Sequence, residues 1–213
     1  MSRWRPEAVS LLLPDDLGMG DAVGALAARV EALALPRGTR VACVVPAPFV
    51  RYVLVPWNAQ MQSRKARQVF AEHCFRETYG ELARDWIVRV DAARFGGAAL
   101  ACAMNASLFD ELSRMAEARG VVLESVQPAL MNAFNASPAP LAVDSTWIVV
   151  PGTGTLTLLL VEGGQPLRVA LVAGSLDRLD ALLHREWFSL GREGCWSHVR
   201  VCMLAPLPEP QAA

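Results

Sequence analysis

The feature that most constrains the fold is a continuous apolar run, Val41 to Val45, which lies between Gly38 and Pro46. This pattern is typical of a strand that is buried on both faces, because each face must then be covered by another layer. The chain has enough apolar residues to build those layers, since 53% of its 213 residues are hydrophobic. The sequence therefore predicts an α/β fold with a sizeable core, and a folded state for most of the chain.

The residues before this run predict a strand and a helix. Ala8 to Leu13 favour a short strand, and Asp21 is expected to cap a helix with apolar residues at steps of three and four. Asp15 and Asp16 lie in the turn between these two elements. Since negative charge is favoured at a helix N-terminus, we interpret both carboxylates as capping groups.

The middle of the chain predicts two helices and a hairpin. A long helix is expected from about Met61 to Tyr79, and residues 85–91 and 98–104 should pair across Gly96-Gly97. A second helix should begin near Ser107, which forms a capping box with Asp110. Residues 121–126 then predict another strand.

The second half of the chain has the clearest strand pattern. Residues 147–150, 154–161 and 167–172 predict an antiparallel meander, with turns that contain Gly152 and Gly163-Gly164. Gly174-Ser175 should cap an amphipathic helix, and a last strand is expected at about 198–204.

Composition excludes several classes of protein. The 20 basic and 21 acidic residues give a net charge of -1, which removes the electrostatic basis for a dedicated nucleic-acid binder. Lys65 is the only lysine, so the chain cannot contain a GxxxxGK[ST] phosphate-binding loop. Every apolar run is shorter than the ~18 residues of a membrane-spanning helix, and no secretory signal is recognisable. We therefore expect a cytoplasmic protein whose five cysteines are reduced thiols.

Three stretches carry a resemblance to a known fold. They are Val44-Val45-Pro46 with the following 51–56, residues 99–126, and residues 147–174. Their order resembles the actin-like (ASKHA) fold, specifically the PilM-type proteins of type IV pilus assembly and the GspL cytoplasmic domain of type II secretion. The resemblance spans roughly residues 40 to 204.

The resemblance implies a division of the chain. It implies a degenerate actin-like (ASKHA/RNase H-like) fold with two mixed-sheet lobes and an inserted α+β subdomain. The first lobe, truncated at its N-terminus, is expected at 1–48 and 128–140, and the insert at 49–127. The second lobe is expected at 141–205, followed by a flexible tail at 206–213.

The loops that bind nucleotide in this fold are altered. The resemblance implies an Asp-x-Gly hairpin at the start of the first lobe, but the chain passes almost directly from its first strand to its helix and leaves little room for such a hairpin. In the second loop, Val150-Pro151-Gly152 places an apolar side chain where an acidic one should hold the metal. Thr153 and Thr155 persist, but hydroxyl groups alone cannot offset the charge of Mg-nucleotide. We therefore interpret Pro151, Gly152, Thr153 and Thr155 as a vestigial loop, and expect no cofactor.

A zinc site is the main alternative site in the sequence. Cys195, His198 and Cys202 form a C-x2-H-x3-C pattern, and His184 or Glu193 could supply a fourth ligand. Structural zinc sites usually show a second tight pair of ligands, which is missing here. We therefore expect no metal, and an ordinary packing role for these side chains.

One basic cluster is a candidate partner surface. Arg64, Lys65 and Arg67 lie near the start of the long helix, where the helix dipole slightly disfavours positive charge. Together with Phe70 they could form a charged contact surface with an apolar anchor. An ordinary solvated helix face explains the same residues.

The resemblance implies a non-enzymatic scaffold that binds the cytoplasmic tail of an inner-membrane pilus or secretion platform protein. It would meet the membrane only through such partners, and further expected partners are the assembly ATPase and a second copy of the chain. The alternative is an actin-like ATPase or kinase relative that binds nucleotide through rearranged loops. A small zinc-dependent regulator is a third interpretation.

Overall fold

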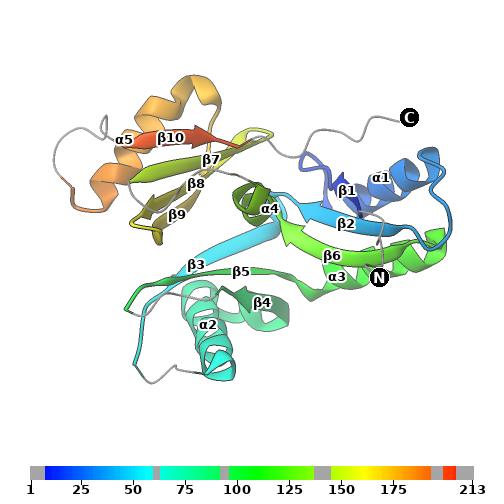
Figure 1. The fold of residues 1–213 in the computed structure, drawn as a ribbon, viewed down its shortest axis with the longest axis horizontal. Helices are drawn as coiled ribbons and strands as arrows, with labels where there is room; N and C mark the ends of the chain where they lie inside the picture. The colour runs from blue at the N-terminus through cyan, green and yellow to red at the C-terminus, as the bar shows by residue number, and fades with distance from the viewer. Residues whose placement is uncertain (1–7, 60–62, 92–95, 137–144, 193–198, 205–213) are drawn as a thin grey trace, which may run out of the picture.

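The computed structural model describes residues 8–59, 63–91, 96–136, 145–192 and 199–204. The helices are α1 (Met19–Ala32), α2 (Arg64–Tyr79), α3 (Ala106–Arg119), α4 (Ala129–Ala136) and α5 (Leu179–Ser189). The strands are β1 (Val9–Leu12), β2 (Arg40–Val45), β3 (Val50–Val55), β4 (Trp86–Val90), β5 (Ala99–Asn105), β6 (Val122–Pro128), β7 (Thr146–Gly152), β8 (Thr155–Glu162), β9 (Gln165–Ala173) and β10 (Arg200–Met203). They form three sheets (Figure 1).

The first lobe is built on a parallel sheet with the strand order β1-β2-β6. Strand β2 is the apolar run of the sequence, and Val41, Cys43, Val44 and Val45 are each at most 2% exposed. Cys43 packs with the side chains of α1 and α3 on one face, whereas Val44 packs with α4 on the other. The prediction of a strand buried on both faces is therefore confirmed.

The insert is a small antiparallel sheet with the order β3-β5-β4. The predicted hairpin of β4 and β5 is confirmed. Helix α2 covers one face of this sheet, where Ala71 and Phe75 pack with Val88 and Ala101. The opposite face is turned toward β6 and α4 (Figure 1).

The second lobe has the strand order β10-β7-β8-β9, in which β7, β8 and β9 form the predicted antiparallel meander. Helix α5 covers one face through Leu183 and Trp187, which pack on Trp147. The other face packs on α4. Ile148 and Leu159 of this face and Leu130 of α4 belong to one cluster of buried side chains. Helix α4 therefore lies between the two lobes (Figure 1).

Several local expectations are corrected by the structure. Gly18, not Asp21, is the N-cap of α1, and Asp21 lies in its first turn. Asn105, not Ser107, caps α3, because its side-chain oxygen accepts a hydrogen bond from the Ser107 N–H. Gly174-Ser175 leads into a 3-10 helix (Leu176–Arg178) and not directly into α5.

Strand β6 shows that the chain returns from the insert to the first lobe earlier than expected. The range 49–127 was expected to form the insert, yet nearly all of β6 falls inside that range and pairs with β2 of the first lobe. Helix α3 also packs in the first-lobe core, through Leu108 and Leu112. Among the described strands, the sheet of the insert consists of β3, β4 and β5, and none of the three pairs with a strand of another sheet. The tail expected at 206–213 lies outside the described residues.

No helix among the described residues is long and apolar enough to cross a membrane.

Candidate functional site

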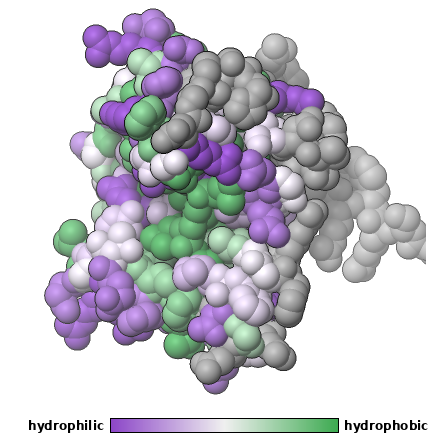
Figure 2. Space-filling model, turned by 90° about the vertical axis from the view of Figure 1, so that its left-hand side faces the viewer, coloured by the Kyte–Doolittle hydropathy of each residue, from purple (hydrophilic) through white to green (hydrophobic). Residues whose placement is uncertain are grey.

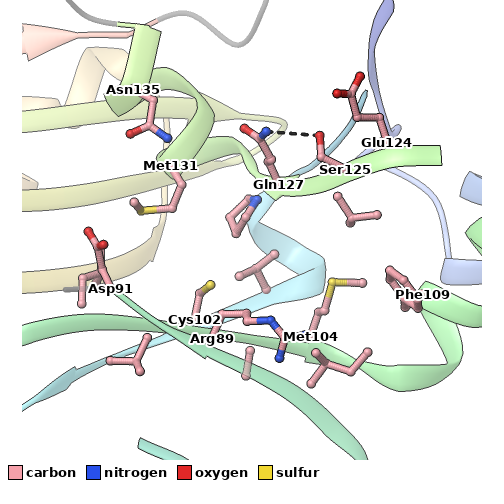
Figure 3. A pocket seen from close by; sticks show the side chains of 17 residues that line it. Arg89, Asp91, Cys102, Met104, Phe109, Glu124, Ser125, Gln127, Met131 and Asn135 are labelled. Atoms are coloured by element: carbon pink, nitrogen blue, oxygen red, sulfur yellow. Dashed lines mark hydrogen bonds between the residues drawn. The ribbon is translucent and has the colours of Figure 1, made fainter. Parts of the chain in front are cut away.

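A groove between the insert and the first lobe is the largest candidate site that we describe. Its volume is about 570 Å³. Strands β4 and β5 of the insert form its floor, β6 forms one wall and α4 forms the other (Figure 3). The groove therefore lies where the insert meets β6 and the helix that directly follows it, α4.

The floor of the groove is the face of the insert sheet that α2 leaves uncovered. Successive residues of a strand point to opposite faces. Val88 therefore packs under α2, whereas Ile87 and Arg89 on either side of it line the groove. On β5 the same alternation directs Cys102 and Met104 into the groove (Figure 3).

The wall formed by β6 presents its edge. Five consecutive residues of this strand, Glu124 to Pro128, line the groove. Since only alternate residues of a strand share a face, such a continuous contribution means that the edge of β6 faces the groove. In the strand order β1-β2-β6, this edge pairs with no other strand in the part of the chain that the structure describes. Its backbone N–H and C=O groups are therefore placed to pair with an added strand.

The groove has an apolar centre and a polar rim. Leu100, Met104 and Met131 supply apolar surface, and Arg89, Asp91 and the amide of Asn135 lie around it (Figure 3). Gln127 Nε2 donates a hydrogen bond to Ser125 Oγ at 3.2 Å, as Figure 3 shows. Such a combination suits a ligand with apolar side chains and backbone amides.

Charge in the groove is largely balanced. Glu124 forms an ion pair with Arg40, and both side chains are 30% exposed. Burial raises the pKa of the Cys102 thiol to about 11, and the nearby Asp91 carboxylate adds to this rise while Arg89 opposes it. The thiol is therefore neutral at physiological pH and acts as a small apolar group, not as a nucleophile.

A smaller cavity of about 200 Å³ continues the groove toward the second lobe. It shares Asp91, Leu100 and Met131 with the groove and ends at the β8–β9 turn, beside Gln165. Figure 2 shows the side of the molecule on which this end lies, with an apolar hollow between hydrophilic rims. A ligand in the groove can therefore extend past α4 to the second lobe.

The loop that was interpreted as vestigial lies on a different surface, in the cleft between the lobes, and its interpretation stays a prediction. Pro151 and Gly152 end β7, Thr153 occupies the turn and Thr155 begins β8. Asp15 of the first lobe reaches this turn, where the Thr153 N–H and the Thr153 hydroxyl each donate to its carboxylate at 2.7 Å. The interpretation of Asp15 as a helix cap is therefore wrong.

The basic cluster lies away from the groove. Arg64 and Lys65 are exposed, Arg67 is half-buried, and all three lie on α2, which covers the opposite face of the insert sheet. Phe70 is half-buried and packs against the core of the insert. The structure thus places Phe70 as a packing residue, and the role of the three basic residues as a partner surface stays a prediction.

The zinc pattern is only partly within the described residues. Cys195 and His198 lie outside them, and Cys202 is a half-buried free thiol on β10. Among the residues that the structure describes, no group of three His, Cys, Asp or Glu side chains is close enough to hold a metal ion.

The residues of the groove were not identified from the sequence. One signal was present, because Arg89 and Asp91 alternate with apolar Val88 and Val90 in the strand that precedes the hairpin. That pattern indicates a strand with one face free of the core. It does not say what lies opposite that face, and β6 and α4 are supplied only by the fold.

Comparison with known proteins supports the architecture. No known protein-family profile matches the chain, and no curated protein matches it in sequence. The structure is similar to the cytoplasmic domain of EpsL, an inner-membrane component of the type II secretion system of Vibrio cholerae. The TM-score is 0.55 at 12% identity, over 89% of this chain and 68% of that one.

Two further solved structures are similar to the chain. A protein of Bacteroides thetaiotaomicron with an actin-like ATPase fold and unknown function has a TM-score of 0.57 at 11% identity, over 91% of this chain and 70% of that one. A chain of the PilM-PilN type IV pilus biogenesis complex has a TM-score of 0.53 at 17% identity, over 84% of this chain and 56% of that one. The chain therefore has the actin-like fold that the resemblance implied. Identities this low establish the fold alone.

Proposed function

We propose that the chain is a non-enzymatic scaffold of a type IV pilus or type II secretion assembly platform. In this proposal it lies in the cytoplasm and reaches the inner membrane only through a partner. It holds an extended segment of that partner's cytoplasmic tail in the groove between β6 and the insert. The observation that carries the proposal is the unpaired edge of β6, which borders an apolar groove.

The geometry supports an extended peptide as the ligand. A peptide that adds a strand to a sheet edge gains main-chain hydrogen bonds, and pockets for alternate side chains then supply specificity. Here the edge of β6 supplies the first element, and the apolar centre at Leu100, Cys102 and Met131 supplies the second. Two of the similar solved structures belong to an inner-membrane secretion component and a pilus biogenesis complex, which favours a platform protein as the source of the peptide.

The chemistry of the groove gives catalysis little support. Among the described residues its lining contains no histidine and its thiol is neutral; of its two carboxylates, Glu124 is engaged by Arg40, which leaves Asp91. General acid–base or nucleophilic catalysis needs a base within hydrogen-bond reach of a reacting group. A binding role requires none of these groups.

The test is a binding measurement with two matched variants. Fluorescence anisotropy is measured with labelled peptides that cover the cytoplasmic tails of inner-membrane proteins of both platforms. Ile87→Trp fills the groove and should weaken binding at least tenfold. Val69→Trp adds the same side chain on α2, on the other face of the insert sheet, and should leave binding unchanged.

Two outcomes would contradict the proposal. One is that none of the tails binds the folded protein. The other is that Ile87→Trp, with a native circular dichroism spectrum, binds a tail as tightly as the unmodified chain.

A further inference from the structure

The turn between β7 and β8 holds a carboxylate from the other lobe. Asp15 Oδ2 accepts a hydrogen bond from the Thr153 N–H, and Oδ1 accepts one from the Thr153 hydroxyl, both at 2.7 Å. The two residues are 138 positions apart in the chain. Hydrogen bonds to an ionised carboxylate are shorter and about twice as strong as neutral ones. The contact therefore joins the lobes through the charge of Asp15.

The donors at this turn are of the kind that bind anions. Backbone N–H groups presented by a turn can bind anions, and here the Thr153 hydroxyl adds a second donor beside the Thr153 N–H. Gly154 in the same turn has a φ of +66°, a left-handed conformation that glycine adopts without strain. Asp15 thus presents its own carboxylate where a free anion would otherwise find these donors.

Position 152 gives independent support, because its backbone conformation does not require a glycine. Its φ lies outside the left-handed region, so alanine could adopt the same conformation. The space around it is the constraint: a Cβ at position 152 would lie 2.9 Å from Asp15 Oδ2 and 3.0 Å from Thr155 Oγ1. The absence of a side chain at this position makes room for the Asp15 carboxylate.

The cavity beside this contact favours the same conclusion. It has a volume of about 300 Å³, and most of its lining is apolar, from Leu12, Ala47 and Val150 among others. Among the described residues of that lining, Asp15 is the one that carries a charge. A polyanion that entered the cavity would meet a fixed negative charge and no cationic side chain from the lining, which is unfavourable for its binding.

We propose that Asp15 is an internal ligand of the β7–β8 turn, which takes the place of an anion and fastens the two lobes together across the cleft. The proposal concerns the cleft and is independent of the peptide groove. It assigns Gly152 the role of admitting the carboxylate, and Thr153 the role of binding it.

The test compares the thermal midpoints of Asp15→Ala, Gly152→Ala and the double variant. Each single change should lower the midpoint, because one removes the carboxylate and the other displaces it. The double variant should lose less than the sum of the two single changes, since the added Cβ then meets Thr155 Oγ1 but has no carboxylate to displace. Asp16→Ala, the exposed neighbour, is the matched control and should keep the midpoint of the unmodified chain.

Amide exchange measured by NMR gives a second readout. The exchange rate of the Thr153 amide should rise about tenfold in Asp15→Ala and in Gly152→Ala, and stay unchanged in Asp16→Ala. Pyrophosphate added to the unmodified chain should leave the Thr153 amide resonance where it is.

Three results would overturn the proposal. The first is a Gly152→Ala effect of full size in the Asp15→Ala background. The second is a Thr153 amide that exchanges equally fast with and without Asp15. The third is a pyrophosphate-dependent shift of the Thr153 resonance in the unmodified chain, which would mean that its donors are available to a free anion.

Discussion

The two lobes cover their sheets with helices in similar ways but connect their strands differently. In the first lobe β1, β2 and β6 are parallel, so each connection must leave the sheet and return. In the second lobe β7, β8 and β9 are joined by two-residue turns. Gly163 and Gly164 in one of these turns have φ values of +56° and +76°, which fit a tight hairpin.

This difference explains how the cleft is built. The second lobe contributes the β7–β8 hairpin turn, in which the Thr153 N–H is a backbone donor. The first lobe contributes the segment between β1 and α1, from which Asp15 reaches across. The cleft between the β1–α1 segment and the β7–β8 turn could receive a ligand, and the Asp15 side chain of the first lobe lies there instead.

The cores of the two lobes also differ in composition. The first is largely aliphatic, with Leu26 and Leu112 among its buried side chains. The second contains Trp147 and Trp187, together with an ion pair between Arg168 and the buried Glu186. The stability of the second lobe therefore depends on fewer side chains, each of which makes a larger contribution.

The largest expected effect comes from the core of the second lobe. Trp147 is completely buried, and Trp147→Ala should lower the free energy of unfolding by roughly 4 kcal/mol because of the lost contacts and the cavity left behind. Leu112→Ala in the first lobe should cost about 3 kcal/mol. Urea titration followed by circular dichroism measures both values. A smaller loss for Trp147→Ala than for Leu112→Ala would contradict the comparison.

The ion pair of the second lobe should give a smaller effect. Arg168 donates to Glu186 Oε2 from Nε at 3.0 Å and from a terminal nitrogen at 2.8 Å, and the Glu186 side chain is 7% exposed. Arg168→Met leaves Arg185, at 3.3 Å from Glu186 Oε1, as the remaining cationic partner of the buried carboxylate. The change should cost about 2 kcal/mol, less than for a fully buried pair because Arg168 is 39% exposed. In the first lobe Arg40→Met, which breaks the pair with Glu124, should cost about 0.5 kcal/mol. If Arg168→Met and Arg40→Met lower the free energy of unfolding equally in urea titrations, the burial of Glu186 does not strengthen its ion pair.

A further small effect depends on pH and concerns the first lobe. Burial raises the pKa of the Cys43 thiol from 9.0 to about 12, so the folded thiol stays neutral when the unfolded one ionises. The stability that this thiol contributes is complete below pH 9 and is lost as the pH rises from 9 toward 12. Between pH 8 and pH 10 the loss should be about 1 kcal/mol.

Two variants on the same strand test this dependence. Cys43→Ala should reduce the slope of stability against pH over this range. Val45→Ala, also fully buried on β2, should lower stability by a similar amount at each pH and keep the slope. An unchanged slope in Cys43→Ala would contradict the assignment.

The sequence by itself determined the elements and the fold class. The apolar run of β2, the double glycine of the β8–β9 turn and the long helix α2 were predicted close to their observed bounds. These features follow from local rules, namely the burial period of a strand or helix and the few residues that tolerate positive φ. The helix caps were assigned less well, because Asp21 and Ser107 are residue types that favour caps, whereas the backbone starts the two helices at Gly18 and Asn105.

Only the tertiary structure decided the two sites. The groove needs the predicted hairpin, with Ile87 and Cys102, to lie opposite Gln127 of β6 and Met131 of α4, and no local pattern encodes that placement. Asp15 is a suitable cap by its position in the sequence, yet its partner Thr153 lies on the other lobe. Grooves and contacts between lobes arise from how separate layers pack, and this packing is determined by shape and burial over the whole chain, not by the preferences of neighbouring residues.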